Sequence, residues 1–177
     1  PGAEKKRGGE KMEDKLFRQA MGKFATGVTV VTLQGKEGIH GMTANAFMSV
    51  SLEPKLITIS IDHKARMFLK MQEAERFAIS ILSINQLDIA RHFARQKLLG
   101  REVVFEYIQD IPAIGGALAQ VACEKVQSIP VGDHTLFIGK VLELKISEGE
   151  PLVFFGGKFG NYQPFEIGIL EKGGFGK

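Results

Sequence analysis

The chain has 177 residues, of which 44% are hydrophobic and 24% are charged, a composition that excludes a disordered or fibrous protein. The formal net charge is +3, and part of the excess of basic residues lies before Met12. We therefore expect the folded domain to be nearly neutral and to lack the basic surface that is typical of nucleic-acid-binding proteins. The sequence contains a single cysteine, which cannot form an internal disulfide. No apolar run reaches the length of about 18 residues that a membrane-spanning helix needs. We therefore expect a cytoplasmic protein that does not enter a membrane.

The chain is expected to form one domain. Residues 1–11 are polar and glycine-rich and are interpreted as an N-terminal extension, and residues 167–177 as a C-terminal tail. No internal repeat or change of composition divides residues 12–166, which are interpreted as the domain.

The first element is predicted to be an amphipathic helix over residues 13–25. Its apolar residues recur at spacings of three and four: Leu16, Phe17, Ala20, Met21 and Phe24. The β-branched run 28–33 is too short for a helix and predicts a strand, and a second extended segment is expected over 39–44.

The remaining elements are mostly short strands. Residues 56–61 alternate apolar with small polar side chains, which is typical of a half-buried strand. Further strands are predicted over 77–82, 119–129, 134–146 and 151–155, and further helices over 65–73 and 85–95. In the last helix the inward side is expected to carry Leu87, Ile89, Ala90 and Phe93. Many short strands separated by glycine and proline indicate a mainly β fold with few helices, an antiparallel barrel.

Motifs of several enzyme classes are absent from the sequence. It has no glycine-rich Rossmann fingerprint after a strand, no P-loop and no Gly-x-Ser-x-Gly elbow. The four histidines lack the spacing of metal ligands, so we expect no metal site. Hydrolase, kinase and metalloenzyme functions are disfavoured.

Residues 41–54 are rich in small side chains that carry hydroxyl or amide groups. Backbone N–H groups and hydroxyls of this kind can hold a phosphate or the polar edge of a flat heterocycle. Asn45 offers both a donor and an acceptor, which suits a pyrimidine-like edge. The alternative is a polar loop whose hydroxyls satisfy local backbone groups.

Three other segments are candidates for a site. Gly132 and Asp133 are expected to form a hairpin turn that places His134 at a strand end, where it could contact a ligand or simply be exposed. Residues 154–162 mix aromatic side chains with glycines and could stack against a ring or pack in the core. Lys64 and Arg66 stand before a predicted helix, where cations oppose the helix dipole unless an anion binds there.

These segments together resemble the flavin reductase family, in particular the small reductase components of two-component monooxygenases that act on phenol or 4-hydroxyphenylacetate. The resemblance covers residues 12–166 and rests on the order and spacing of four segments. They are 17–32 (FRQAMGKFATGVTVVT), 41–54 (GMTANAFMSVSLEP), 132–134 (GDH) and 151–157 (PLVFFGG).

The resemblance implies an antiparallel Greek-key barrel, the FMN-binding split barrel, and specific roles for individual residues. Thr43, Ala44 and Asn45 would face the flavin ring. Ser49, Val50 and Ser51 would hold its phosphate region, with Ser60 and Lys64 nearby. His134, Phe155 and Gly156 would lie on the nicotinamide side, with His134 as an orienting donor and not as a base.

The resemblance also implies a reaction and partners. The expected cofactors are FAD or FMN with NADH, NADPH being the alternative, and hydride would pass from nicotinamide C4 to flavin N5 without a catalytic protein residue. A homodimer and a partner monooxygenase that receives the reduced flavin are expected. The alternative function is a non-catalytic flavin-binding module for electron transfer or sensing.

Overall fold

The structure, a computed structural model, describes residues 9–165. Its helices are α1 (Gly9–Met21), α2 (Arg66–Glu73), the 3₁₀ turn η1 (Ile84–Gln86) and α3 (Leu87–Phe93). The first strands are β1 (Thr26–Gly27), β2 (Thr29–Gly35), β3 (Gly38–Ala44), β4 (Phe47–Leu52), β5 (Lys55–Asp62) and β6 (Arg76–Ile81). They are followed by β7 (Phe105–Ile108), β8 (Ile111–Ile114), β9 (Ala119–Val131), β10 (His134–Ile146), β11 (Leu152–Phe155) and β12 (Lys158–Asn161).

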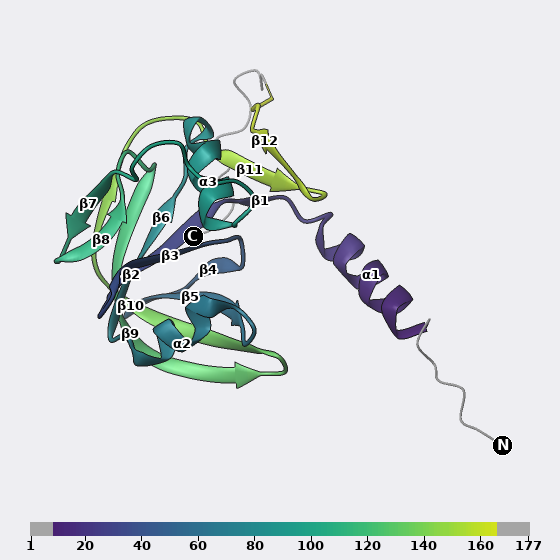
Figure 1. The fold of residues 1–177 in the computed structure, drawn as a ribbon, viewed down its shortest axis with the longest axis horizontal. Coiled ribbons are helices and arrows are strands. Elements are labelled where there is room, and N and C mark those ends of the chain that lie inside the picture. Colours follow the sequence, from purple (N-terminus) through teal and green to yellow (C-terminus); the bar gives the residue numbers. More distant parts are fainter. Residues whose placement is uncertain (1–8, 166–177) are drawn as a thin grey trace.

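A seven-stranded antiparallel sheet forms the body, in the order β3-β2-β6-β9-β10-β5-β4 (Figure 1). Its two outermost strands, β3 and β4, are joined by residues 45–46 alone. In a flat sheet these strands would lie about 29 Å apart, at about 4.8 Å for each step between strands. The short link spans at most about 11 Å, so the sheet must roll up until its edges meet at the link. The predicted antiparallel barrel is confirmed, and the non-sequential strand order is what a Greek-key arrangement requires.

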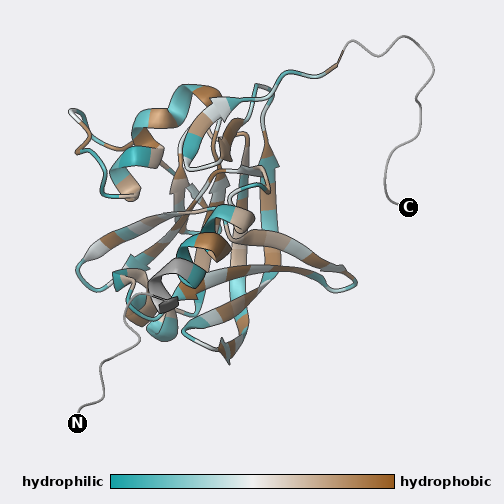
Figure 2. Cartoon of the chain, turned by 90° about the vertical axis from the view of Figure 1, so that its right-hand side faces the viewer, coloured by the Kyte–Doolittle hydropathy of each residue, from teal (hydrophilic) through white to brown (hydrophobic). Residues whose placement is uncertain are grey.

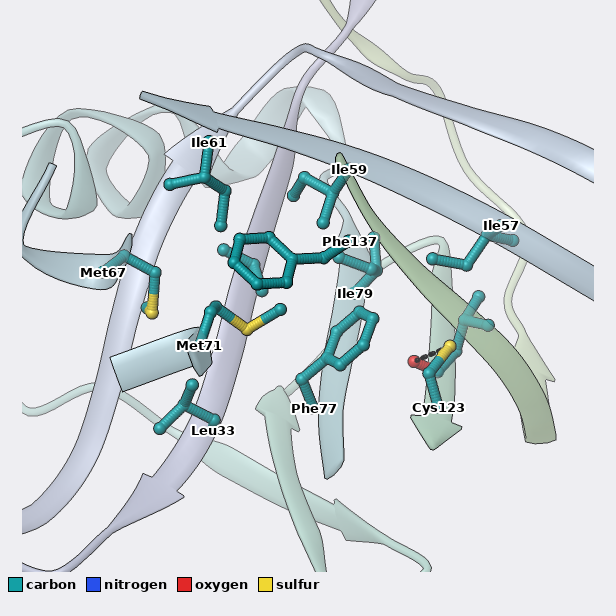
Figure 3. Packing of buried hydrophobic residues seen from close by; sticks show 12 residues of the cluster. Leu33, Ile57, Ile59, Ile61, Met67, Met71, Phe77, Ile79, Cys123 and Phe137 are labelled. Atoms are coloured by element: carbon teal, nitrogen blue, oxygen red, sulfur yellow. Dashed lines mark hydrogen bonds between the residues drawn. The ribbon is translucent and has the colours of Figure 1, made fainter. Parts of the chain in front are cut away.

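The inside of the rolled sheet is an apolar core. Alternate residues of β5 point inward, namely Ile57, Ile59 and Ile61, and they pack around the fully buried Phe77 and Phe137 (Figure 3). The free Cys123 belongs to the same core. Burial raises the pKa of its thiol to about 12, so the thiol stays protonated and serves as a packing group.

Helix α2 closes the barrel interior at one opening. Met67 and Met71 insert from this helix into the core. The ammonium of Lys125 on β9 donates to the carbonyls of Met71 and Gln72, each at 2.7 Å. Two carbonyls at the end of the helix are thereby satisfied, and α2 is held against the sheet.

Helix α3 packs on the outer face of the sheet, over β2 and β3. Ile89 and Ala90 are buried there, and Leu87 and Phe93 are partly buried, as the sequence predicts. Two local features permit close contact with β3. The Thr43 hydroxyl donates to the Ala90 carbonyl at 2.7 Å, and Gly41 has no side chain where a Cβ would lie 2.3 Å from the Phe93 ring.

Helix α1 is amphipathic, as predicted, but it projects away from the body (Figure 1). Its apolar residues are exposed, with Leu16 and Phe17 at 66% and Met21 at 57%, and the following Phe24 is at 78%. Figure 2, viewed from the side to which α1 projects, shows hydrophobic segments in brown along this helix. Within one chain the described residues leave this face uncovered. Because α1 begins at Gly9, it includes the end of the segment expected to be an extension, whereas the expected tail lies outside the described residues.

The predicted strands are confirmed, but the sequence pattern does not predict five further strands, β1, β4, β7, β8 and β12. β4 is an edge strand with exposed hydroxyl-bearing residues, and such a strand lacks the clear alternation of a half-buried one. No helix among the described residues is both long and apolar enough to cross a membrane.

Gly139 on β10 tests the packing of the core. A Cβ at this position would lie 2.7 Å from Phe77 Cζ and 2.9 Å from Cys123 Cβ, both in fully buried side chains. Gly139→Ala should lower the free energy of unfolding by about 1–3 kcal/mol, measured by denaturant titration. The matched control is Gly160→Ala, because a Cβ there would meet nothing within 4 Å. Equal stability of the two variants would contradict the packing described for this core.

Candidate functional site

The residues predicted to face a ring lie where the two edge strands meet. Thr43 and Ala44 end β3, and Asn45 follows them in the link to β4. Asn45 is exposed, and Thr43 and Ala44 are partly buried. Among residues 9–165 no strand pairs with the outer edge of β3, so its backbone donors and acceptors are open to a ligand.

These three residues line a hollow of about 160 Å³. Two aromatic residues also line it, Phe154 on β11 and Phe159 on β12, whose ring centroids lie 5.2 Å apart. A lining that combines uncharged hydrogen-bonding groups with aromatic rings fits a flat heterocycle with one polar edge.

Phe154 is a lining residue that the sequence analysis missed when it named Phe155. Phe154 pairs with Thr26 in the antiparallel ladder between β1 and β11 and lines the hollow. The next residue along a strand points to the opposite face, and Phe155 is 49% exposed. Strand alternation could have distinguished the two phenylalanines only if their pairing with β1 had been known.

The hydroxyl of Thr43 is already engaged. It donates to the Ala90 carbonyl of α3 and therefore holds the helix to the strand. The donors that this segment can present to a ring are thus its backbone N–H groups and the carboxamide of Asn45.

The residues predicted to hold a phosphate follow along β4 and β5. Ser49 and Val50 are exposed and Ser51 is partly buried, and the ladder to β5 shifts register between Ser49 and Ser51. Ser60 lies at the link itself, because its backbone N–H donates to the Ala46 carbonyl at 3.0 Å. Ser60 and Asn45 are thereby brought close together.

Lys64 lies just after β5 and is exposed. It lines a second, larger cavity of about 650 Å³ between β3, α2 and the end of α3. Arg66, the other cation singled out in the sequence, lines the same cavity, and Thr43 lines both this cavity and the hollow.

His134 lies at the tip of the β9–β10 hairpin, as predicted. Gly132 has φ +59°, the positive value that the first residue of a tight hairpin turn requires. His134 begins the next strand and pairs with Asp62 on β5. The imidazole Nδ1 lies 2.7 Å from an Asp133 carboxylate oxygen, and this hydrogen bond lowers the pKa of Asp133. With Asp133 ionised, Nδ1 carries the proton, so Nε2 accepts when the ring is neutral and donates when it is protonated.

The other two residues predicted on the nicotinamide side are not close to His134 in one chain. Phe155 ends β11, and the N–H of Gly156 donates to the Gly22 carbonyl at 2.8 Å, just beyond α1. In Figure 1 the β9–β10 hairpin and the β11–β12 pair lie on opposite sides of the β3–β4 link.

Known proteins are similar to this chain over most of its length. Residues 21–163 match the model of the flavin reductase like domain. The chain belongs to this family.

Individual members of the flavin reductase family are similar over most of their length. An NADH-dependent flavin reductase of a Rhodococcus species is 44% identical over 81% of this chain and 83% of its own. The reductase component of 4-hydroxyphenylacetate 3-monooxygenase from Thermus thermophilus is 36% identical over 78% of this chain and 90% of its own. The solved structure of the flavin reductase PheA2 is 50% identical and superposes with a TM-score of 0.83, covering 85% of this chain and 99% of that one.

Asn45 tests the hollow, because its exposed carboxamide contributes little to folding. Asn45→Ala should weaken flavin binding by about 3- to 10-fold, the value of one hydrogen bond, as measured by titration of flavin fluorescence. Gln72→Ala is the matched control, since Gln72 is an exposed amide on α2 that lines neither the hollow nor the larger cavity. Unchanged affinity in Asn45→Ala would remove Asn45 from the site.

Proposed function

We propose that the chain is an NADH-dependent flavin reductase that supplies reduced FMN or FAD to a partner monooxygenase. The observation that carries this proposal is the hollow at the β3–β4 link, which Asn45 and two aromatic residues line in a member of the flavin reductase family. Two similar proteins support it: one is an NADH-dependent flavin reductase, and the other is a reductase component of a two-component monooxygenase.

A bound flavin would supply the redox chemistry, with its N5 as the hydride acceptor and nicotinamide C4 as the donor. The chain's own residues bind and orient. The open edge of β3 and the Asn45 carboxamide contact the polar edge of the ring, and their donors stabilise negative charge there. Phe154 and Phe159 exclude water from one side of the hollow. Ser60 and Lys64 contact the phosphate region, and no residue acts as a nucleophile. Ser49 and Ser51 pair with Ile57 and Leu56, toward the opposite end of β5 from Lys64, so Ser49, Val50 and Ser51 contact another part of the flavin than Lys64 does.

His134 orients the nicotinamide carboxamide. Asp133 holds the imidazole through Nδ1 and leaves Nε2 directed to a ligand. A neutral ring accepts a hydrogen bond from the carboxamide N–H₂ group, and a protonated ring donates to its oxygen. Phe155 and Gly156 contribute to the same nicotinamide site from a second copy of the chain, because within one chain the β11–β12 pair and the β9–β10 hairpin lie on opposite sides of the β3–β4 link (Figure 1).

The active form is a homodimer. The hollow of about 160 Å³ is smaller than the roughly 300–1,000 Å³ of sites that enclose a ligand, so one chain covers a flavin only in part. The exposed apolar face of α1, with Leu16, Phe17 and Met21, offers a surface that a second copy would bury.

The activity is tested by following NADH oxidation with and without added flavin. Oxidation should depend on FMN or FAD, and NADH should bleach the flavin absorbance under anaerobic conditions. His134→Ala should raise the Michaelis constant for NADH about 3- to 10-fold, through loss of one hydrogen bond, and leave flavin affinity unchanged. Flavin that binds but is not bleached would instead support the electron-transfer or sensing module.

The dimer is tested by analytical ultracentrifugation. The wild-type protein should sediment with twice the mass of the 19.4 kDa chain. Phe17→Asp should produce monomers and weaken flavin binding, because a charge would replace an apolar contact. Val104→Asp introduces the same charge at an exposed apolar residue away from α1 and should leave the mass unchanged. A wild-type monomer would refute this part of the proposal.

A further inference from the structure

The turn between β5 and α2 brings two of the proposed binding residues close to each other. His134 begins β10 and pairs with Asp62 at the end of β5, and Lys64 follows two residues after Asp62. The pKa of Asp133 is lowered first by the hydrogen bond from His134 and, to a smaller extent, by the positive charge of Lys64. One chain therefore places the residue proposed for the nicotinamide beside a residue proposed for the flavin phosphate.

His63 stands directly before Lys64 and makes two hydrogen bonds to the hairpin that carries His134. Its backbone N–H donates to the Asp133 carbonyl at 3.0 Å, and its Nε2 lies 2.9 Å from the Thr135 hydroxyl oxygen. Asp133 and Thr135 are the two neighbours of His134 along the chain. The residues on both sides of His134 are thus held by His63.

The Thr135 hydroxyl depends on His63. Thr135 is 3% exposed and points into the barrel, as does Phe137 two residues later. Within residues 9–165 the hydroxyl has no hydrogen-bond partner other than His63. Because a buried hydroxyl without a partner is unfavourable, the start of β10 keeps the position in which this hydrogen bond forms.

The imidazole of His63 also contacts α2. Its ring centroid lies 4.6 Å from that of Phe68, which belongs to the first turn of the helix, and the Phe68 ring lies 6.3 Å from that of Phe137 in the core. The turn before the helix is fixed by a hydrogen bond from the Lys64 N–H to an Asp62 carboxylate oxygen at 2.8 Å. The imidazole therefore joins the start of α2 to the turn that carries Lys64.

We propose that His63 is a positioning residue for the reductase reaction, which holds His134 through Thr135 and Lys64 through Phe68. The proposal rests on the proposed function, in which His134 orients the nicotinamide and Lys64 contacts the flavin phosphate. His63 touches neither ligand, because Thr135 and Phe68 engage its ring. One side chain keeps two binding groups, at the start of β10 and just before α2, at a fixed separation.

Two substitutions of His63 separate its contacts. His63→Phe keeps an aromatic ring against Phe68 but removes the hydrogen bond to Thr135, so the Michaelis constant for NADH should rise about 2- to 5-fold while the Kd for FMN is unchanged. His63→Gln keeps a side-chain amide that can bond to Thr135 but removes the ring. In this variant the Kd for FMN should rise about 2- to 5-fold while the Michaelis constant for NADH is unchanged.

Riboflavin, which lacks the phosphate, tests whether the effect on flavin binding acts through Lys64. His63→Gln should leave the Kd for riboflavin unchanged, because the hollow proposed for the ring lies at the β3–β4 link and not at α2. Titration of flavin fluorescence measures both affinities. Equal losses for FMN and riboflavin would mean that the whole flavin site has moved, and would overturn the role assigned to the ring of His63.

Thr135→Val removes the same hydrogen bond and leaves His63 in place, so it should reproduce the rise in the Michaelis constant for NADH. The matched control is Thr58→Val, because Thr58 is also a buried threonine whose hydroxyl donates within the sheet, to the Phe137 carbonyl. Thr58 pairs with Ile138, away from the hairpin tip, so this variant should lower the melting temperature and leave the Michaelis constant unchanged. An equal rise in both threonine variants would assign the effect to a general loss of stability and overturn the proposal.

A lower melting temperature in both His63 variants, with unchanged constants for NADH and FMN, would assign His63 to the fold alone and overturn the proposal. The reductase function would then still stand, because flavin-dependent NADH oxidation by the wild-type protein is measured in the same assay. A wild-type protein that oxidises no NADH with FMN or FAD would refute the function and, with it, the positioning role.

Discussion

The two outermost strands of the sheet are neighbours in the chain, and the link between them has only two residues. A flat arrangement would separate β3 from β4 by several strand spacings, which such a link cannot span. The sheet therefore rolls up so that the side chains of Ile57, Ile59 and Ile61 on β5 lie on its inner face. Phe77 and Phe137 fill the interior. The edges meet at the link, and no further strand in the described part of the chain pairs with them, so the backbone edge of β3 stays open.

The open edge determines where ligands can bind. At the link it forms the small hollow with Phe154 and Phe159, and further along it forms the larger cavity with α2 and α3. The two helices are positioned by contacts with the sheet: Met67 and Met71 hold α2, and the contacts of Thr43 and Gly41 hold α3. Groups that contact a ring are uncharged, whereas the cations gather in the cavity beside it. This separation suits a ligand with a flat redox ring at one end and phosphates beyond it.

The proposed homodimer would explain two features that one chain leaves incomplete. The apolar face of α1 projects from the body without a described partner. The β9–β10 hairpin, which carries His134, lies across the β3–β4 link from the β11–β12 pair, which carries Phe155. A flavin bound in the shallow hollow would be enclosed only when a second copy covers it. The redox ring would then lie between two chains, and each would contribute part of the nicotinamide site.

The sequence by itself determined the elements with strong local patterns. Alternation in residues 56–61 and the β-branched run at 28–33 predicted strands, and the Gly132–Asp133 turn placed His134 at a strand end, because these features depend on neighbours along the chain. The order and spacing of segments such as 41–54 also indicated the family, which comparison with known proteins confirmed. β4 was missed, because an exposed edge strand has little alternation.

Only the tertiary structure decided which side chains share a site. Phe154 and not Phe155 lines the hollow, since the pairing of β11 with β1 selects the face, and the Thr43 hydroxyl is engaged by a helix 47 residues away. Arg66 and Arg95 meet at one cavity because α2 and α3 pack beside the same strand edge. Contacts of this kind depend on register and helix packing between distant segments, which local periodicity does not encode.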